Sequence, residues 1–223
     1  MKGAPVSGAS GSSAPVYQAA SLLLTYPDPE TWPRRVDAVR TVLSDPAVLH
    51  GSPAGCAEAL LRFCRNVDGV APLDLAARYV ATFDRTRRRT LDLTYYTDGD
   101  TRRRGGSLAR LKGVLHEHGW EPGGGRLPDF LPVLLEFAAR CPDPGERLLR
   151  EHRPGLDLLR HALDAYGSPY TDVLLAVRDA LPGPGPTAAD RAAVRDLALG
   201  GPPVETVGLE PFTRSGPARG GVR

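Results

Sequence analysis

Residues 128–141, PDFLPVLLEFAARC, decide the fold class, because their apolar side chains recur along one face of a helix. Phe130, Val133, Leu134 and Phe137 are three to four positions apart, which is the period of an α-helix and not the alternation of a strand. The same spacing recurs along most of the chain, and only residues 90–95 form a short run that suits a strand. The sequence therefore predicts an all-α protein.

We expect a single-domain bundle of about eight helices. The apolar spacing and the Pro and Gly breakers predict helices at residues 15–26, 29–43, 56–67, 72–83, 107–118, 128–141, 154–166 and 169–181. Asp28 suits an N-cap, with Pro29 at the first helical position. The run PGPGP at residues 182–186 then marks the end of the packed domain.

The two ends of the chain differ from this helical domain. We expect a flexible N-terminus at residues 1–14, an all-helical domain at 15–181 and a Pro/Gly-rich tail at 182–223. Within the tail, residues 187–199 suit a short helix. The apolar segment ETVGLEPF, residues 205–212, suits either a docking motif or a segment that folds back onto the domain.

Composition favours a cytoplasmic protein with no direct membrane insertion. No apolar run approaches the ~18 residues that cross a bilayer. The three cysteines lack the spacing of a disulfide framework or a zinc site, which suits a reducing compartment.

Enzymatic chemistry has no candidate constellation in the sequence. His116 and His118 are two positions apart, so on a helix they point about 200° away from each other and cannot share a metal ion. The Gly run at residues 123–125 lacks the Lys-Ser/Thr end of a phosphate loop. We therefore expect a protein that is not an enzyme and that binds no metal or cofactor of its own.

Residues 85–105 concentrate charge, with seven arginines and three aspartates around LDLTYYTDGD. This segment has a net charge of +4, whereas the whole chain has +2. Such a segment suits phosphate binding, base stacking or a solvated connection between helices. An Arg-mediated nucleic-acid-binding protein is therefore an alternative function, although the near-neutral chain and the absence of a recognition motif disfavour it.

Three segments together resemble the NarJ-type assembly chaperones of the TorD-like redox-enzyme maturation family. They are LLLTYPDPETW (22–32), LDLTYYTDGDTRRRG (91–105) and LPDFLPVLLEF (127–137), and residues 205–212 resemble the C-terminal segment of that family. The resemblance implies a chaperone that binds the N-terminal leader segment of the immature catalytic (alpha) subunit of nitrate reductase and supports insertion of its molybdenum cofactor. The nearest alternative is a chaperone for another molybdoenzyme.

The resemblance also implies a peptide groove. A basic amphipathic leader helix needs an apolar floor and acidic partners for its arginines. The candidates are Leu91, Leu93, Tyr95 and Tyr96 for floor and anchors, and Asp92, Asp98, Asp100, Asp129 and Glu136 for charge. Core packing is the alternative for the two leucines, helix capping for Asp129, and turn formation for Asp98 and Asp100. Phe130 stands where the family often has His, which makes this position more apolar.

Overall fold

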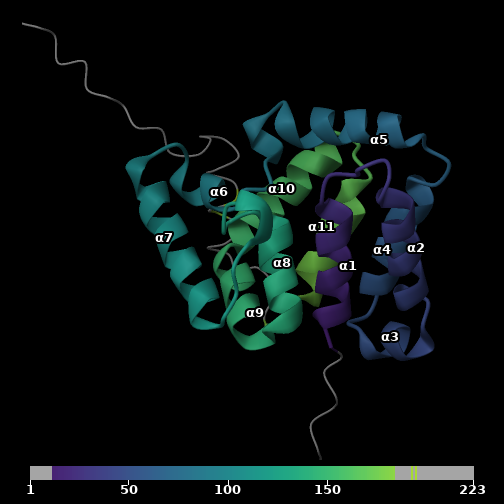
Figure 1. Ribbon diagram of the computed structural model, residues 1–223, viewed down its shortest axis with the longest axis horizontal. Helices are drawn as coiled ribbons and strands as arrows, with labels where there is room; N and C mark the ends of the chain where they lie inside the picture. The colour runs from purple at the N-terminus through teal and green to yellow at the C-terminus, as the bar shows by residue number, and fades with distance from the viewer. Residues whose placement is uncertain (1–11, 184–191, 193, 195–223) are drawn as a thin grey trace, which may run out of the picture.

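The computed structural model describes residues 12–183, 192 and 194, and this part of the chain is all-α, as predicted (Figure 1). Its α-helices are α1 (Ala14–Leu24), α2 (Trp32–Leu43), α3 (Pro46–Gly51), α4 (Cys56–Asn66), α5 (Pro72–Tyr79), α6 (Thr94–Asp98), α7 (Arg102–Glu117), α8 (Leu131–Arg140), α9 (Pro142–Glu151), α10 (Arg153–Ala165) and α11 (Tyr170–Ala180). Short turns of helix, η1 (Val80–Asp84), η2 (Arg87–Arg89) and η3 (Gly123–Gly125), lie between them.

The core forms around α1, which packs against α8, α11, α4 and α2. Figure 1 shows α1 and α8 next to each other at the centre of the molecule. The Ser21 hydroxyl donates to the Pro132 carbonyl oxygen at 2.7 Å, which fixes the two helices along their axes. Tyr17, Leu134 and Phe137 are fully buried, so the apolar face predicted for residues 128–141 does face the core.

The sequence pattern missed three of the described α-helices, α3, α6 and α9, and two of them, α3 and α9, have simple physical explanations. Helix α3 has no fully buried side chain, although Val48 and Leu49 pack partly against the core, so its apolar face is short. It is started by Asp45, whose Oδ1 accepts a hydrogen bond from Ala47 N at 2.8 Å. Helix α9 contains Pro142 and Pro144, which resemble breakers. Proline is tolerated in the first turn of a helix, where its missing N–H has no intrahelical partner in any case.

Two predicted helix starts are also corrected. Asp28 caps a turn and not α2, because its Oδ1 accepts from Glu30 N and Thr31 N at 3.1 Å while the helix begins at Trp32. Helix α7 begins at Arg102, five residues before the predicted start at Ser107, and includes the Gly-Gly pair at residues 105–106.

The predicted strand at residues 90–95 is reduced to one isolated bridge. Asp92 pairs with Phe130 in antiparallel fashion, Leu131 N donates to Leu91 O at 2.8 Å, and α6 begins directly after this at Thr94. The bridge ties the segment before α6 to the start of α8. It therefore joins two of the segments that carry candidate site residues.

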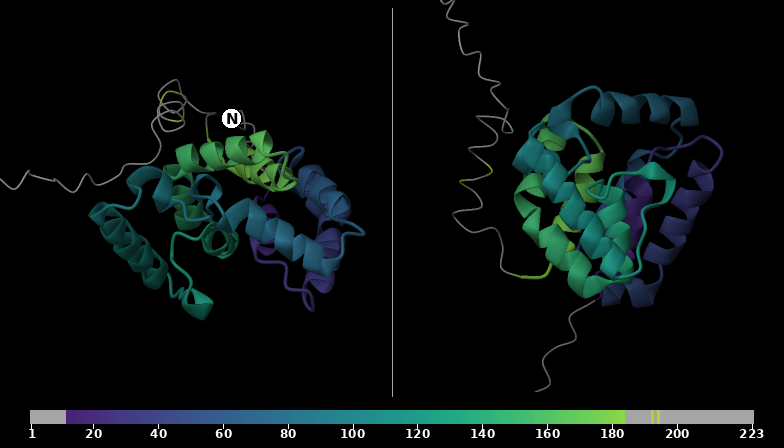
Figure 2. Two further views of the ribbon diagram at one scale, coloured as in Figure 1. Left: turned by 90° about the horizontal axis from the view of Figure 1, so that it is seen from above. Right: turned by 60° about the vertical axis from the view of Figure 1, so that its left-hand side comes forward.

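Helix α7 lies at one side of the molecule in Figure 1 and in the left view of Figure 2. Only Leu111 and Leu115 of this helix are buried, and its packing is chiefly against α6. No helix within the described residues is long and apolar enough to cross a membrane. Apart from residues 192 and 194, the helix predicted at residues 187–199 lies outside the described residues, as does the apolar segment at 205–212.

Candidate peptide-binding surface

A buried acidic cluster joins α6, α7 and the start of α8. Asp129 is fully buried, and its Oδ2 accepts hydrogen bonds from the Thr94 hydroxyl and from Thr94 N, the latter at 3.3 Å. Arg104 places Nη2 3.4 Å from both Asp129 Oδ2 and Asp92 Oδ2, and donates from Nε to the Thr94 hydroxyl at 3.2 Å. The cluster therefore holds the three elements together.

The interpretation of Asp129 as a cap of its own helix is wrong. The N-cap of α8 is Phe130, with no side-chain bond, and Asp129 instead accepts at the N-terminus of α6. Two carboxylates share one arginine here, so the cluster has one carboxylate in excess. Burial, and then the charge of Asp129, raise the pKa of Asp92, while Arg104 opposes this shift. The side chain of Asp92 is 33% exposed and is the accessible part of the cluster.

The hydrophobic candidates of the 91–96 segment divide into core and surface. Leu91 and Leu93 are buried, which confirms the core-packing alternative and removes them from the surface of a groove. Tyr96 is also buried, and its hydroxyl donates to Thr90 O at 2.9 Å. Tyr95 is half-buried, packs edge-on against Tyr96 and has the guanidinium of Arg87 5.8 Å from its ring centroid. Of these candidates, Tyr95 alone offers a partly exposed aromatic face.

Asp98 is the last residue of α6, and Asp100 lies in the turn between α6 and α7. Gly99 has φ +60°, a conformation that favours glycine, and the Asp98 carbonyl accepts from the Thr101 hydroxyl at 2.7 Å. Asp100 is exposed and forms an ion pair with Arg87. The turn thus links the arginines of η2 to the start of α7.

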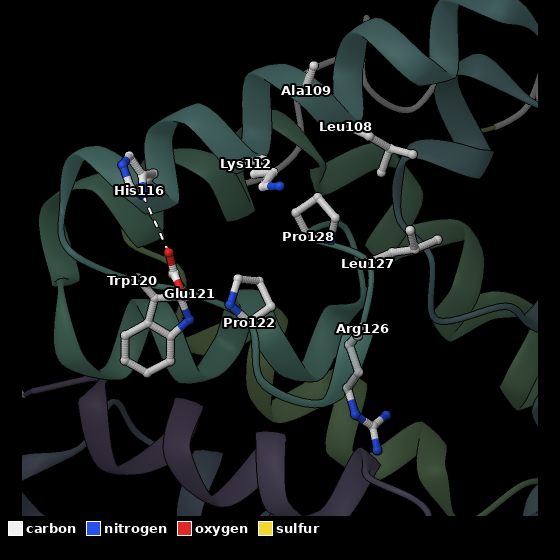
Figure 3. Close-up of a pocket in the computed structure, with 11 residues that line it drawn as sticks. Leu108, Ala109, Lys112, His116, Trp120, Glu121, Pro122, Arg126, Leu127 and Pro128 are labelled. Carbon is white, nitrogen blue, oxygen red and sulfur yellow. Dashed lines mark ion pairs between the residues drawn. The ribbon is translucent and has the colours of Figure 1, made fainter.

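A cavity of about 500 Å³ lies between α7 and the connection from α7 to α8 (Figure 3). Figure 3 shows Leu108 and Lys112 of α7 on one side and Pro122, Leu127 and Pro128 of the connection on the other. The wall is mainly apolar, with charge at its edges. The remaining lining residues are Ala109, His116, Trp120, Glu121, Gly125 and Arg126.

Trp120 forms one end of the cavity and rests on α8. Its ring centroid is 6.2 Å from that of Phe137, and the guanidinium of Arg140 lies 5.1 Å from the centre of the Trp120 ring. Arg140 in turn pairs with Glu136 at 3.2 Å, so this predicted site residue is connected to the cavity through Arg140 and Trp120. At the other end lies Pro128, which directly precedes the buried Asp129 in the chain.

The rim of the cavity carries both signs of charge. Lys112 and Arg126 are basic and exposed, whereas Glu121 is acidic and lies 3.9 Å from His116 Nδ1. Arg126 lies 4.9 Å from the centre of the Phe130 ring, so the position where the family often has His is a stacking platform here. Within the described residues, no group of three His, Cys, Asp or Glu side chains is arranged to hold a metal ion.

Sequence reasoning missed this cavity. It treated HGWEPGGGRLPD, residues 118–129, only as the end of one helix and the start of the next. Two features could have indicated it. Trp120 stands close to a Gly run, and Leu127, which is 44% exposed in the structure, follows that run. An aromatic residue and an exposed leucine in one Gly/Pro-rich connection indicate a surface that another apolar group covers.

Comparison with known proteins finds a family model and several relatives that agree with one another. The family model described as "Nitrate reductase delta subunit" matches residues 50–176. The "Nitrate reductase-like protein NarX" of Mycobacterium tuberculosis (strain ATCC 25618 / H37Rv) is 39% identical over 163 residues, which is 73% of this chain but 24% of that protein. This chain therefore spans about a quarter of the length of that relative.

Two relatives of more similar length carry chaperone names. The "Probable nitrate reductase molybdenum cofactor assembly chaperone NarJ" of Bacillus subtilis (strain 168) is 29% identical over 180 residues, covering 80% of this chain and 95% of that protein. The "Nitrate reductase molybdenum cofactor assembly chaperone NarJ" of Escherichia coli (strain K12) is 33% identical over 159 residues, covering 70% of this chain and 66% of that protein. These matches confirm the resemblance that the three sequence segments indicate.

Proposed function

The chain belongs to the nitrate reductase delta subunit family, and we propose that it is an assembly chaperone for a nitrate reductase. In this role it binds the N-terminal leader segment of the immature catalytic subunit in the cytoplasm and supports insertion of the molybdenum cofactor. It is a binding protein and not an enzyme. The observation that carries the proposal is the apolar cavity beside α7, whose volume suits side chains of a peptide helix.

The leader binds with its apolar face toward α7 and the 120–128 connection. Leu108, Trp120 and Leu127 offer apolar surface that no other described element covers completely. An amphipathic helix that covers this surface removes it from water, which is the main favourable term in such binding. Tyr95, the partly exposed aromatic side chain near the turn after α6, is a further anchor.

Acidic side chains at both ends of the cavity meet the leader's basic residues. At one end, Asp92 is the partly exposed carboxylate of the cluster in which two carboxylates share Arg104. At the other end, Glu121 and Glu136 lie near Trp120. Charge-assisted bonds of this kind orient a peptide more than they strengthen its binding. Lys112 and Arg126 repel cations, so the leader's arginines turn away from them and toward the carboxylates.

The other candidates act by supporting this surface. Asp129 aligns α6, α7 and the start of α8, and Leu91, Leu93 and Tyr96 hold the connecting segment in the core. Asp98 and Asp100 form the turn that sets the start of α7.

Two exposed leucines provide a matched test. Leu127 lines the cavity and is 44% exposed, whereas Leu73 is 75% exposed on α5 and does not line it. The probe is a synthetic peptide with the N-terminal sequence of the catalytic subunit of nitrate reductase, measured by titration calorimetry. Leu127→Ala is expected to raise the Kd roughly tenfold, because about 1.5 kcal/mol of favourable apolar burial is lost, whereas Leu73→Ala is expected to leave the Kd unchanged.

If both variants bind the leader peptide as tightly as the parent chain, the cavity is not part of the binding site. The choice of client is tested in the same titration with leader peptides of other molybdoenzymes. If one of these binds more tightly than the nitrate reductase leader, the chaperone role stands with a different client.

A further inference from the structure

Six of the seven arginines of residues 85–104, all but Arg102, divide into two groups, and the leader-binding proposal uses neither fully. Three of them have partners within the fold. Arg89 donates from Nε to Thr82 O at 2.8 Å and stacks 3.8 Å from the centre of the Tyr166 ring. Arg104 joins the buried acidic cluster, and Arg87 pairs with Asp100. These three explain how the segment is held in place.

A second group faces solvent. Arg85, Arg88 and Arg103 are exposed, and among the described residues their guanidinium groups form no ion pair, hydrogen bond or ring contact. The Arg87–Asp100 pair brings η2 beside the turn that starts α7, and Arg103 follows Asp100 by three residues. We call the surface of Arg85, Arg88 and Arg103 the arginine face.

The charges at the start of α7 oppose the dipole of that helix. Helix α7 has three arginines and no acidic residue in its first turn, where the helix dipole favours negative charge. Its N-cap Thr101 makes no side-chain capping bond that would compensate. Arg88 adds a further charge beside Arg87 and Arg89 in η2. Repulsion of this kind is relieved when a partner brings negative charge.

We propose that the arginine face docks an acidic, Asp/Glu-rich segment of a partner polypeptide. This second interaction surface goes beyond the proposed leader binding, because a basic leader is repelled here. Guanidinium groups pair with single carboxylates in bidentate fashion, and carboxylates spaced along a polypeptide can each reach one arginine. A nucleic-acid backbone fits less well, because the whole chain carries a net charge of only +2, whereas the phosphates of a nucleic acid form a dense row of negative charge.

The arginine face and the cavity share one helix. Arg103 precedes Leu108 by five residues, which is about 7.5 Å along the axis of α7. A partner with an apolar, basic segment and an acidic segment can therefore occupy both surfaces at once. Joining two weak contacts in this way raises the overall affinity through effective concentration.

A charge-reversal experiment tests the proposal on the full chain. The probe is fluorescently labelled poly-glutamate, with a single-stranded DNA oligonucleotide of equal charge as comparison. The variant Arg85→Glu/Arg88→Glu/Arg103→Glu is expected to weaken poly-glutamate binding at least tenfold. The matched control reverses three exposed arginines of α2, α4 and α9, with the same change in net charge: Arg34→Glu/Arg65→Glu/Arg147→Glu.

The outcomes separate the possibilities. Loss of poly-glutamate binding in the first variant and its retention in the control supports the arginine face. Equal losses in both variants overturn the proposal, since net charge alone then controls binding. Tighter binding of DNA than of poly-glutamate to the parent chain overturns it in favour of a nucleic-acid surface. Because the arginine face repels a basic leader, leader-peptide affinity of the first variant is expected to stay the same or to rise, so failure of this proposal is distinguishable from failure of the proposed function.

Discussion

The substitution Gly145→Ala tests the close packing of α8 and α9, which positions the helix that carries Glu136. A Cβ at residue 145 would lie 2.7 Å from Ala138 Cβ and 2.8 Å from Ala138 N, whereas carbon atoms in contact are about 3.5–4.0 Å apart. The two helices would have to separate by about 1 Å. Because the obstacle includes backbone, a flexible side chain cannot absorb this shift.

The magnitude follows from two opposing terms. Overpacking of a core costs about 1–3 kcal/mol, and a backbone clash belongs at or above the upper end of that range. Replacing Gly by Ala inside a helix stabilises the helix by about 1 kcal/mol. The net loss is about 2 kcal/mol, which lowers the Tm of a chain of this size by about 4–8 °C.

Gly113→Ala is the control, because a Cβ there meets no atom within 4 Å and residue 113 is exposed inside α7. It is expected to raise the Tm by about 1–4 °C through helix propensity alone. Circular dichroism melting of both variants measures the difference. If Gly145→Ala melts at or above the Tm of the parent chain, the close approach of α8 and α9 is refuted.

Three further predictions concern ionisable side chains. Asp129→Asn is expected to lower the free energy of unfolding by about 2–4 kcal/mol, because Arg104 loses a buried partner. Glu136→Gln breaks an exposed ion pair, so it should lower the free energy of unfolding by less than about 1 kcal/mol and weaken only leader binding. If urea titrations show similar losses of stability for Asp129→Asn and Glu136→Gln, the roles assigned to the two carboxylates are wrong. Burial raises the pKa of the Cys56 thiol to about 11, so the folded chain keeps a proton that the unfolded chain releases near pH 9. Stability therefore falls by about 2 kcal/mol from pH 9 to 11, and Cys56→Ala should reduce this loss; identical pH slopes for variant and parent would show that Cys56 has no part in it.

Local patterns predicted helices wherever a helix has an apolar face. The spacing of Phe130, Leu134 and Phe137 predicted α8 because period 3.6 follows from backbone geometry, whatever the helix packs against. Apolar spacing did not predict α3, which has no fully buried side chain, α6, which lies partly in the run that suited a strand, or α9, whose first-turn prolines resemble a break. Helix α3 depends on its cap at Asp45, and α9 depends on packing against α8, more than on apolar spacing.

The candidate site was predictable in composition but not in arrangement. The sequence indicated that residues 91–100 and 127–137 matter together, and a bridge between Asp92 and Phe130 does join them. It did not indicate that Arg104, 25 positions from Asp129, supplies the charge that Asp129 meets. Such pairing depends on which segments the fold brings together, and one sequence holds no record of those distances.

The sequence by itself determined the helical class, the family resemblance and the location of the excess charge, because each is a property of neighbouring residues. Only the tertiary structure decided which of those residues are accessible. Leu93 and Asp129 are enclosed by segments distant in the chain, whereas α7 lies at the edge of the body and leaves Leu108 and Leu127 beside a cavity. Burial results from the packing of all elements at once, so spacing within one segment cannot specify it.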